Sequence, residues 1–158
     1  MVYRKLKYDN DNNILIDNVI FVPSDVAQVY HNSKRAQEEF SHNEPSFRRA
    51  VSLGRRLIDP LTEIVGLANQ DNEILYLPLD PLSNMVNQEL LRTRLDRQII
   101  DIVNEVGVNL NSAIRYTWKR PLLEFVSGLG PRKAKYLTAM VKRHFGHVYQ
   151  RSVLKDIL

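Results

Sequence analysis

The feature that most constrains the fold is a pair of glycines set between two apolar segments. The sequence from Phe125 to Leu137 reads FVSGLGPRKAKYL. Gly128 and Gly130 permit a positive φ and a close approach of the backbone to a neighbour. Pro131 suits the first position of a helix, because it has no N–H group that needs a partner there. The pattern therefore predicts two helices joined by a tight turn, which is a helix-hairpin-helix unit.

The segments on either side of these glycines carry apolar residues at helical spacing. Before the turn the apolar residues are Leu122, Leu123, Phe125 and Val126. After the turn they are Ala134, Leu137, Met140 and Val141. We expect helices over residues 121–126 and 131–145, ended by Gly146, and we expect the small side chain of Ala134 to let them pack closely.

The turn also offers a place for an anion. The first N–H groups of a helix have no partner within the helix, and they point outward at its positive dipole end. Such an end can bind a phosphate oxygen. The residues predicted to do so are Gly128, Gly130, Arg132, Lys133 and Lys135. The alternative is a structural corner, in which the glycines only shape the turn.

A second unit of the same kind is predicted directly upstream. A long helix begins near Met85, has one apolar stripe and ends at Gly107; the stripe consists of Leu91, Leu95, Ile99, Ile102 and Val106. A short helix follows near residues 111–117, with Asn111 able to cap it. We expect Gly107, Asn109 and Asn111 to contact a second phosphate. Two such units would grip one duplex by its backbone rather than its bases.

Charge is distributed unevenly along the 158 residues, whose net charge is +4. From Arg115 to the end there are ten Lys/Arg and two Asp/Glu, whereas residues 1–114 hold twelve and sixteen. Such a basic segment suits an anionic partner, although it can also serve only as a solubilising surface. There is no cysteine and no apolar run of the ~18–20 residues that span a bilayer, so a soluble, intracellular chain is expected.

The first half of the chain predicts a strand and several helices. Residues 13–22 are rich in Ile and Val, as a strand would be. Ser24 is expected to cap a helix that runs on toward Phe40. A second helix is predicted over residues 46–58, and Asp59, followed by proline, is expected to cap the next one. The chain as a whole is therefore predicted to be mainly α, with a small β element at the front.

The sequence shows no catalytic constellation. Asp25 and Asp59 are expected to begin helices, whereas a ribonuclease-H-like nuclease needs clustered carboxylates that hold metal ions. His144 and His147 have no cysteine or carboxylate beside them and do not predict a metal site. We therefore expect no enzyme activity, no metal site and no cofactor.

Two features allow two interpretations each. Arg55 and Arg56 can bind nucleic acid or pair with carboxylates in their own domain. Trp118 can be a platform on which a base stacks, or it can pack against the rest of the protein.

Several stretches of the sequence resemble the Tex-like family. They are FRRAVSLGRRLIDPLTEIV, IVNEVGVNLNSA and LLEFVSGLGPRKA, and they occur in the expected order. VYHNSKRAQEEF is closer to the eukaryotic branch, which comprises suppressor-of-Ty elongation factors and histone chaperones. The resemblance extends from about Asn18 to about Val141. It departs from the family pattern in having Asn109 instead of Asp, NSA instead of Asn-Thr-Ala, and IRYTWKR as a short insertion.

The resemblance implies a fold and a function. Residues 1–82 would be the C-terminal part of a ribonuclease-H-like (YqgF-type) domain with a short β element and following helices. Residues 83–158 would be a tandem helix-hairpin-helix domain. The family's full proteins have further domains, so the chain is expected to be a central piece.

The implied function is that of a non-catalytic nuclear segment that binds the DNA or RNA backbone weakly and without sequence preference. Contacts with the RNA polymerase II elongation complex and with histones would come through the full-length protein. A pure protein-interaction scaffold with structural hairpins is the alternative.

Overall fold

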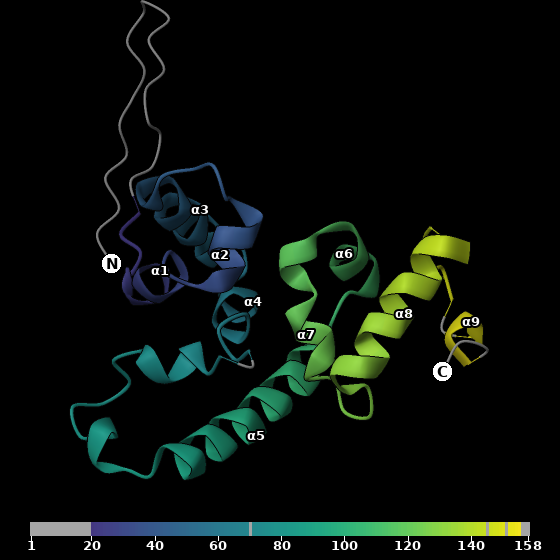
Figure 1. The fold of residues 1–158 in the computed structure, drawn as a ribbon. Coiled ribbons are helices and arrows are strands. Elements are labelled where there is room, and N and C mark those ends of the chain that lie inside the picture. The colour runs from purple at the N-terminus through teal and green to yellow at the C-terminus, as the bar shows by residue number, and fades with distance from the viewer. Residues whose placement is uncertain (1–19, 70, 145, 151, 156–158) are drawn as a thin grey trace, which may run out of the picture.

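The computed structural model describes residues 20–69, 71–144, 146–150 and 152–155, and the described residues form helices and connectors without a strand. Helices α1–α4 gather on one side, α6–α9 lie on the other, and the long helix α5 runs beneath α4 and α7 (Figure 1). Most of the strand predicted over residues 13–22 lies outside the described residues. Its last three residues, 20–22, are in no regular element.

Two short helices replace the single one predicted after Ser24. They are α1 (Asp25–Tyr30) and α2 (Lys34–Glu39). The Ser24 side chain makes no cap hydrogen bond, so that prediction was wrong. The helix is interrupted before Ser33. The Ser33 hydroxyl oxygen accepts a hydrogen bond from the Ala36 N–H at 3.0 Å and so caps the start of α2.

Helix α3 (Pro45–Ile58) confirms the prediction of a helix, and its one buried residue is polar. Phe47, Leu57 and Ile58 are 45%, 53% and 73% exposed, whereas Ser52 is fully buried. The Ser52 hydroxyl donates to Glu63 Oε1 at 2.6 Å, which compensates for burying it. The polar face of α3 therefore turns toward its neighbours.

Helix α4 (Pro60–Val65) begins as the sequence predicts. Asp59 accepts a hydrogen bond from the Thr62 N–H at 3.1 Å, and proline occupies the first turn. The 3₁₀ turns η1 (Glu73–Tyr76) and η2 (Ser83–Met85) then lead to α5 (Gln88–Val106).

The inward face of α5 agrees with the predicted stripe at Leu95 and Ile99 and departs from it nearer the C-terminal end of the helix. Its buried residues are Ile99 and Val103, whereas Ile102 and Val106 are exposed. The first turn is capped by Asn87, whose side chain accepts hydrogen bonds from the next N–H groups. The helix still ends at Gly107, which has a φ of 80°.

The remaining helices are short except for one. They are α6 (Leu110–Arg115), η3 (Thr117–Lys119), α7 (Pro121–Glu124), α8 (Gly130–His144) and α9 (Ser152–Lys155). Gly146 follows α8 with a φ of 63°, and its N–H donates to Val141 O at 2.8 Å. This is the glycine end that the sequence predicts for α8.

One hydrophobic core joins the two halves of the chain. Its buried members from the first half include Val26, Tyr30, Val65, Leu67 and Ile74. Its members from the second half are Ile99, Val103 and Leu122. Two smaller clusters hold α6, α7 and α8 together, around Ile114, Leu137 and Val141 and around Ala113, Leu123 and Ala134. The C-terminal helices are therefore positioned on a support that the N-terminal helices help to form.

Candidate nucleic-acid interface

The turn between α7 and α8 has the geometry that its glycines predict. Gly128 and Gly130 have φ values of 87° and 61°, in the left-handed region that favours glycine. The Leu129 N–H donates to Val126 O at 3.0 Å and tightens the turn. Ala134 is buried in one cluster with Leu123, which brings α7 and α8 together as expected.

The outer surface of this turn is open. A Cβ atom built at Gly128 or Gly130 would meet no other heavy atom within 4 Å. The first N–H groups of α8, a helix of 15 residues, have no partner within the helix. Arg132, Lys133 and Lys135 are exposed close by. The turn between α7 and α8 thus combines backbone donors, a helix dipole and three cations.

Asn104, near the end of α5, holds the turn in place. Its amide nitrogen donates to Ile100 O at 2.5 Å and to Phe125 O at 3.3 Å. Its amide oxygen accepts from the Ser127 N–H at 3.0 Å. Sequence reasoning missed this residue, whose only signal is an amide side chain in the last turn of the preceding helix.

In the upstream hairpin, between α5 and α6, the predicted residues have roles other than those expected. Gly107 is exposed, but Asn109, not Asn111, caps α6 by accepting from the Ser112 N–H at 3.0 Å. The Asn111 amide donates to Val148 O and accepts from the Val148 N–H, both at 2.9 Å. The amide groups of both asparagines are therefore engaged with this chain's own backbone.

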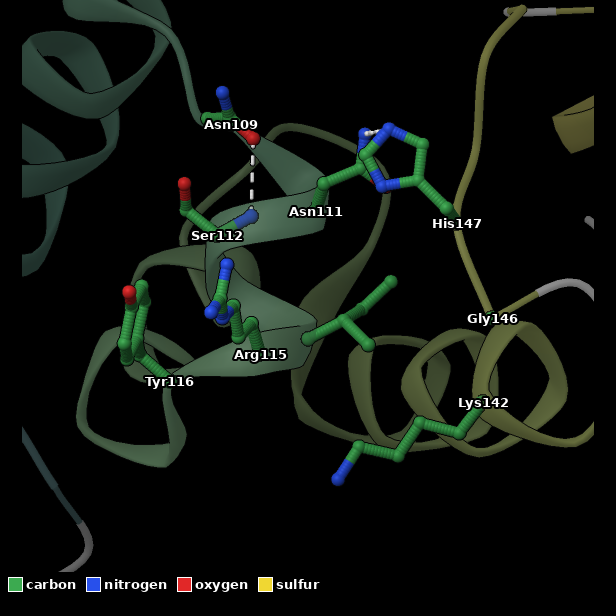
Figure 2. Close-up of a pocket in the computed structure, with 9 residues that line it drawn as sticks. Asn109, Asn111, Ser112, Arg115, Tyr116, Lys142, Gly146 and His147 are labelled. Carbon is green, nitrogen blue, oxygen red and sulfur yellow. Dashed lines mark hydrogen bonds between the residues drawn. The ribbon is translucent and has the colours of Figure 1, made fainter.

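A pocket of about 860 Å³ opens between α6 and the end of α8 (Figure 2). It is lined by Asn109, Asn111, Ser112, Ile114, Arg115, Tyr116, Lys142, Gly146 and His147. In Figure 2 the side chain of Lys142 extends from α8 toward the α6 side, and His147 lies beside Asn111. The predicted residues Asn109 and Asn111 thus line the same pocket as Lys142, which is distant from them in sequence.

A smaller pocket of about 340 Å³ adjoins the first, because Lys142 lines both. It lies along α7 and α8 and contains Arg120, Glu124 and Lys135. We call the cations of the two pockets, Arg115, Arg120, Lys135 and Lys142, the basic groove. Burial raises the pKa of the Glu124 carboxyl, although the nearby Lys135 lowers it.

Arg55 lies away from this groove in a set of internal contacts. Its guanidinium donates to Glu39 Oε2 at 2.7 Å, and the Tyr30 hydroxyl donates to the same oxygen at 2.5 Å. Arg35 donates to Trp118 O at 3.1 Å, and the Arg55 guanidinium lies 5.4 Å from the centroid of a Trp118 ring. We call these five residues the junction network. They favour the structural interpretation of both Arg55 and Trp118.

A second ion pair connects the same elements. Lys119 Nζ lies 2.8 Å from Asp59 Oδ2, so the residue that caps α4 also fixes η3. Hydrogen bonds from Lys119 and from the Thr62 N–H lower the pKa of Asp59 despite its burial. The N-terminal helices are thus attached to the start of the second hairpin by charge as well as by the core.

Two classes of feature are absent from the described part of the chain. None of its helices is long and apolar enough to cross a membrane. No group of three or more His, Asp or Glu side chains there could hold a metal ion.

Family models match both halves of the sequence. The model described as a helix-hairpin-helix motif matches residues 72–157. The model described as Holliday-junction resolvase-like of SPT6 matches residues 2–68.

Curated relatives give the same result. A suppressor of Ty 6 homolog from Caenorhabditis briggsae is 36% identical over 137 residues, which is 87% of this chain and 9% of the relative. The transcription elongation factor SPT6 of Drosophila melanogaster is 34% identical over 139 residues, 88% of this chain and 8% of the relative. The transcription elongation factor SPT6 of Candida albicans is 33% identical over 144 residues, which is 91% of this chain and 10% of the relative. The chain thus spans about a tenth of the length of these relatives.

The helix-hairpin-helix match covers more than half of the sequence, and the two matched models lie in the order that the Tex-like resemblance implies. The chain therefore belongs to the suppressor-of-Ty 6 family of transcription elongation factors.

Proposed function

We propose that this segment binds the sugar-phosphate backbone of DNA or RNA through the turn between α7 and α8. The observation that carries the proposal is the open N-terminus of α8, where Gly128 and Gly130 leave space outside and Arg132 and Lys133 lie exposed. Backbone N–H groups and cations recognise phosphate but do not read bases. Binding is therefore weak and independent of sequence.

In this proposal, residues 83–158 bind the nucleic acid and residues 1–82 hold them in position. The shared core and the ion pair between Asp59 and Lys119 favour a rigid support. The segment acts as a non-catalytic scaffold, in which the partly buried carboxylate of Glu39 and the buried carboxylate of Glu63 are engaged with Arg55 and Ser52. Relatives named transcription elongation factors favour a nuclear setting. The Tex-like resemblance favours the RNA polymerase II elongation complex and histones as partners of the whole protein.

The test compares two glycines that differ mainly in position. Gly130→Val and Gly107→Val both place a side chain at positive φ, with no atom of this chain within 4 Å of the new Cβ. A valine is strained at either φ, which is 61° at Gly130 and 80° at Gly107, so melting curves are needed to show how much each variant is destabilised. Only the side chain at Gly130 stands in front of the first N–H groups of a long helix. We expect Gly130→Val to weaken duplex binding more than Gly107→Val, as measured by fluorescence anisotropy with melting curves as the control.

The salt dependence of the parent protein tests the backbone contacts. If about three to five phosphates are neutralised, log K falls against log salt with a slope of roughly −3 to −4. Equal binding by folded Gly130→Val and parent would reduce the turn to a structural corner. The basic surface would then favour an acidic protein as the partner.

A further inference from the structure

The pocket between α6 and α8 is separate from the α7–α8 turn. It lies at the C-terminal end of α8, about 20 Å from the turn along a helix of 15 residues. Its volume of about 860 Å³ falls within the range of sites that enclose small ligands. The contacts proposed above for the backbone leave this pocket unused.

The pocket gathers positive charge from two elements. Arg115 comes from α6 and Lys142 from α8, and Figure 2 shows both on the border of the same space. The described residues that line it include no carboxylate. An anion would therefore meet two cations there without a competing internal partner in the lining.

Aromatic rings accompany these cations. Tyr116 is 45% exposed, and the guanidinium of Arg115 lies 5.5 Å from its ring centroid. Tyr116 also lines the pocket, so the exposed part of its ring is available to a flat partner. The rings of His147 and Tyr149 also lie together, with their centroids 4.6 Å apart.

The wall of the pocket is held in position before any ligand arrives. Asn111 binds both backbone groups of Val148, and its amide nitrogen lies 3.1 Å from His147 Nε2. Gly146 ends α8 and turns the chain back toward α6. Such a fixed wall lowers the cost of ordering that binding would otherwise require.

We propose that this pocket binds one nucleotide of single-stranded nucleic acid, with its phosphate at Arg115 and Lys142 and its base stacked on Tyr116. The site shares its ligand class with the proposed function and rests on it to that extent. A single strand suits the pocket because an unpaired base can turn toward a ring, whereas bases in a duplex are stacked on each other. Lys135 and Arg120 continue the basic groove toward the α7–α8 turn, so one strand can contact both sites.

The experiment uses a labelled oligothymidylate and a labelled duplex of the same length, with affinity measured by fluorescence anisotropy. Tyr116→Ala is expected to weaken single-strand binding about tenfold, as loss of one base-stacking contact does, and to leave duplex binding unchanged. Tyr116→Phe keeps the ring and should bind as the parent does. Melting curves by circular dichroism show whether each variant is folded.

A matched pair on α8 tests the phosphate contact even if a tyrosine variant does not fold. Lys142 lines the pocket, whereas the neighbouring Arg143 is exposed and does not. Lys142→Ala should reduce the salt slope for the single strand by about 0.7, and Arg143→Ala by less. Equal effects of these two variants would indicate a general attraction between charges and would overturn the proposal that the pocket binds a phosphate.

Two further outcomes separate this proposal from the function it rests on. If Gly130→Val weakens duplex binding while folded Tyr116→Ala binds the single strand as the parent does, the function stands and the pocket is overturned. If no folded variant alters binding to either probe, both fail. A third result is that polyglutamate displaces the single strand from the parent and from Tyr116→Ala equally well. That result would assign the groove to an acidic protein and overturn the proposal that the pocket binds a nucleotide.

Discussion

Arg55 in the junction network and Lys142 in the basic groove carry the same charge in opposite surroundings. The Arg55 side chain is 12% exposed, pairs with Glu39 and lies over the ring of Trp118. Lys142 is exposed and lines two pockets. The five ion pairs found among the described residues include Arg35, Arg55 and Lys119 but no cation of α8. A count of basic residues therefore overstates the surface that can meet an anion.

The carboxylates of the first region show how local the electrostatics are. Burial would raise the pKa of Glu39, but hydrogen bonds from Tyr30 and Arg55 bring it below its ordinary value. Burial raises the pKa of Glu63, and the hydrogen bond from Ser52 offsets only part of this. The pKa values of two carboxyls in one group of helices are thus shifted in opposite directions.

The largest effect is expected from separating the two halves. Residues 83–158 alone should not unfold cooperatively, because Ile99, Val103 and Leu122 would lose the core formed with Val65 and Leu67. Exposing three such side chains costs about 5 kcal/mol, comparable to the whole stability of a small domain. A melting curve of the isolated segment by circular dichroism measures this. A sharp transition near that of the parent would show that the halves are independent.

The next largest effect is expected in the junction network. Arg55→Ala removes the shorter of the two ion pairs of Glu39, leaving Arg35 at 3.8 Å, and should reduce the free energy of unfolding by about 2 kcal/mol. Binding of DNA per folded molecule should not change. Arg94→Ala removes an exposed arginine from α5 and serves as the control for stability. If folded Arg55→Ala loses DNA binding, the distinction between the two basic regions is wrong.

The two carboxylates give a smaller effect that depends on pH. With a lowered pKa, Glu39 contributes stability above its unfolded pKa, and this is lost as pH falls through its folded pKa. With a raised pKa, Glu63 costs stability as pH rises from its unfolded to its folded pKa. At pH 7, urea unfolding should find Glu39→Gln less stable than the parent and Glu63→Gln at least as stable. A loss of stability in Glu63→Gln would contradict the second assignment.

The smallest effect is expected from Lys133→Ala on the α7–α8 turn. It removes one charge but leaves the backbone donors, so the salt slope of duplex binding should decrease by about 0.9. The melting temperature should stay that of the parent, because Lys133 is exposed and outside the ion pairs found in the described residues. A fall in melting temperature would mean that Lys133 supports the fold.

Local features of the fold could be predicted because they depend on neighbours in sequence. Asp59 caps α4, Gly146 ends α8, and Gly128 and Gly130 adopt positive φ, as their chemistry requires. The break after α1 was missed because Ser24 and Ser33 offer the same hydroxyl, but only Ser33 has the extended backbone in which the side chain can cap a helix. The polar inner face of α3 was missed because Glu63, on another helix, satisfies Ser52.

The candidate sites divide in the same way. The α7–α8 turn is one continuous stretch of sequence, so its residues could be proposed together. The pocket joins Arg115 and Tyr116 to Lys142 and His147, which the folded chain alone brings together. The choice between Asn109 and Asn111 as the cap of α6 also depended on a distant partner, since Val148 engages Asn111.

Phosphate binding at the start of α8 is tested most directly by an NMR titration of the ¹⁵N-labelled protein with a short duplex at low salt. We expect the largest shifts on the backbone N–H groups of Gly130, Arg132 and Lys133. The indole N–H of Trp118 and the backbone N–H of Arg55 should not move. Shifts concentrated on α3 and Trp118, with the start of α8 unchanged, would contradict phosphate binding there.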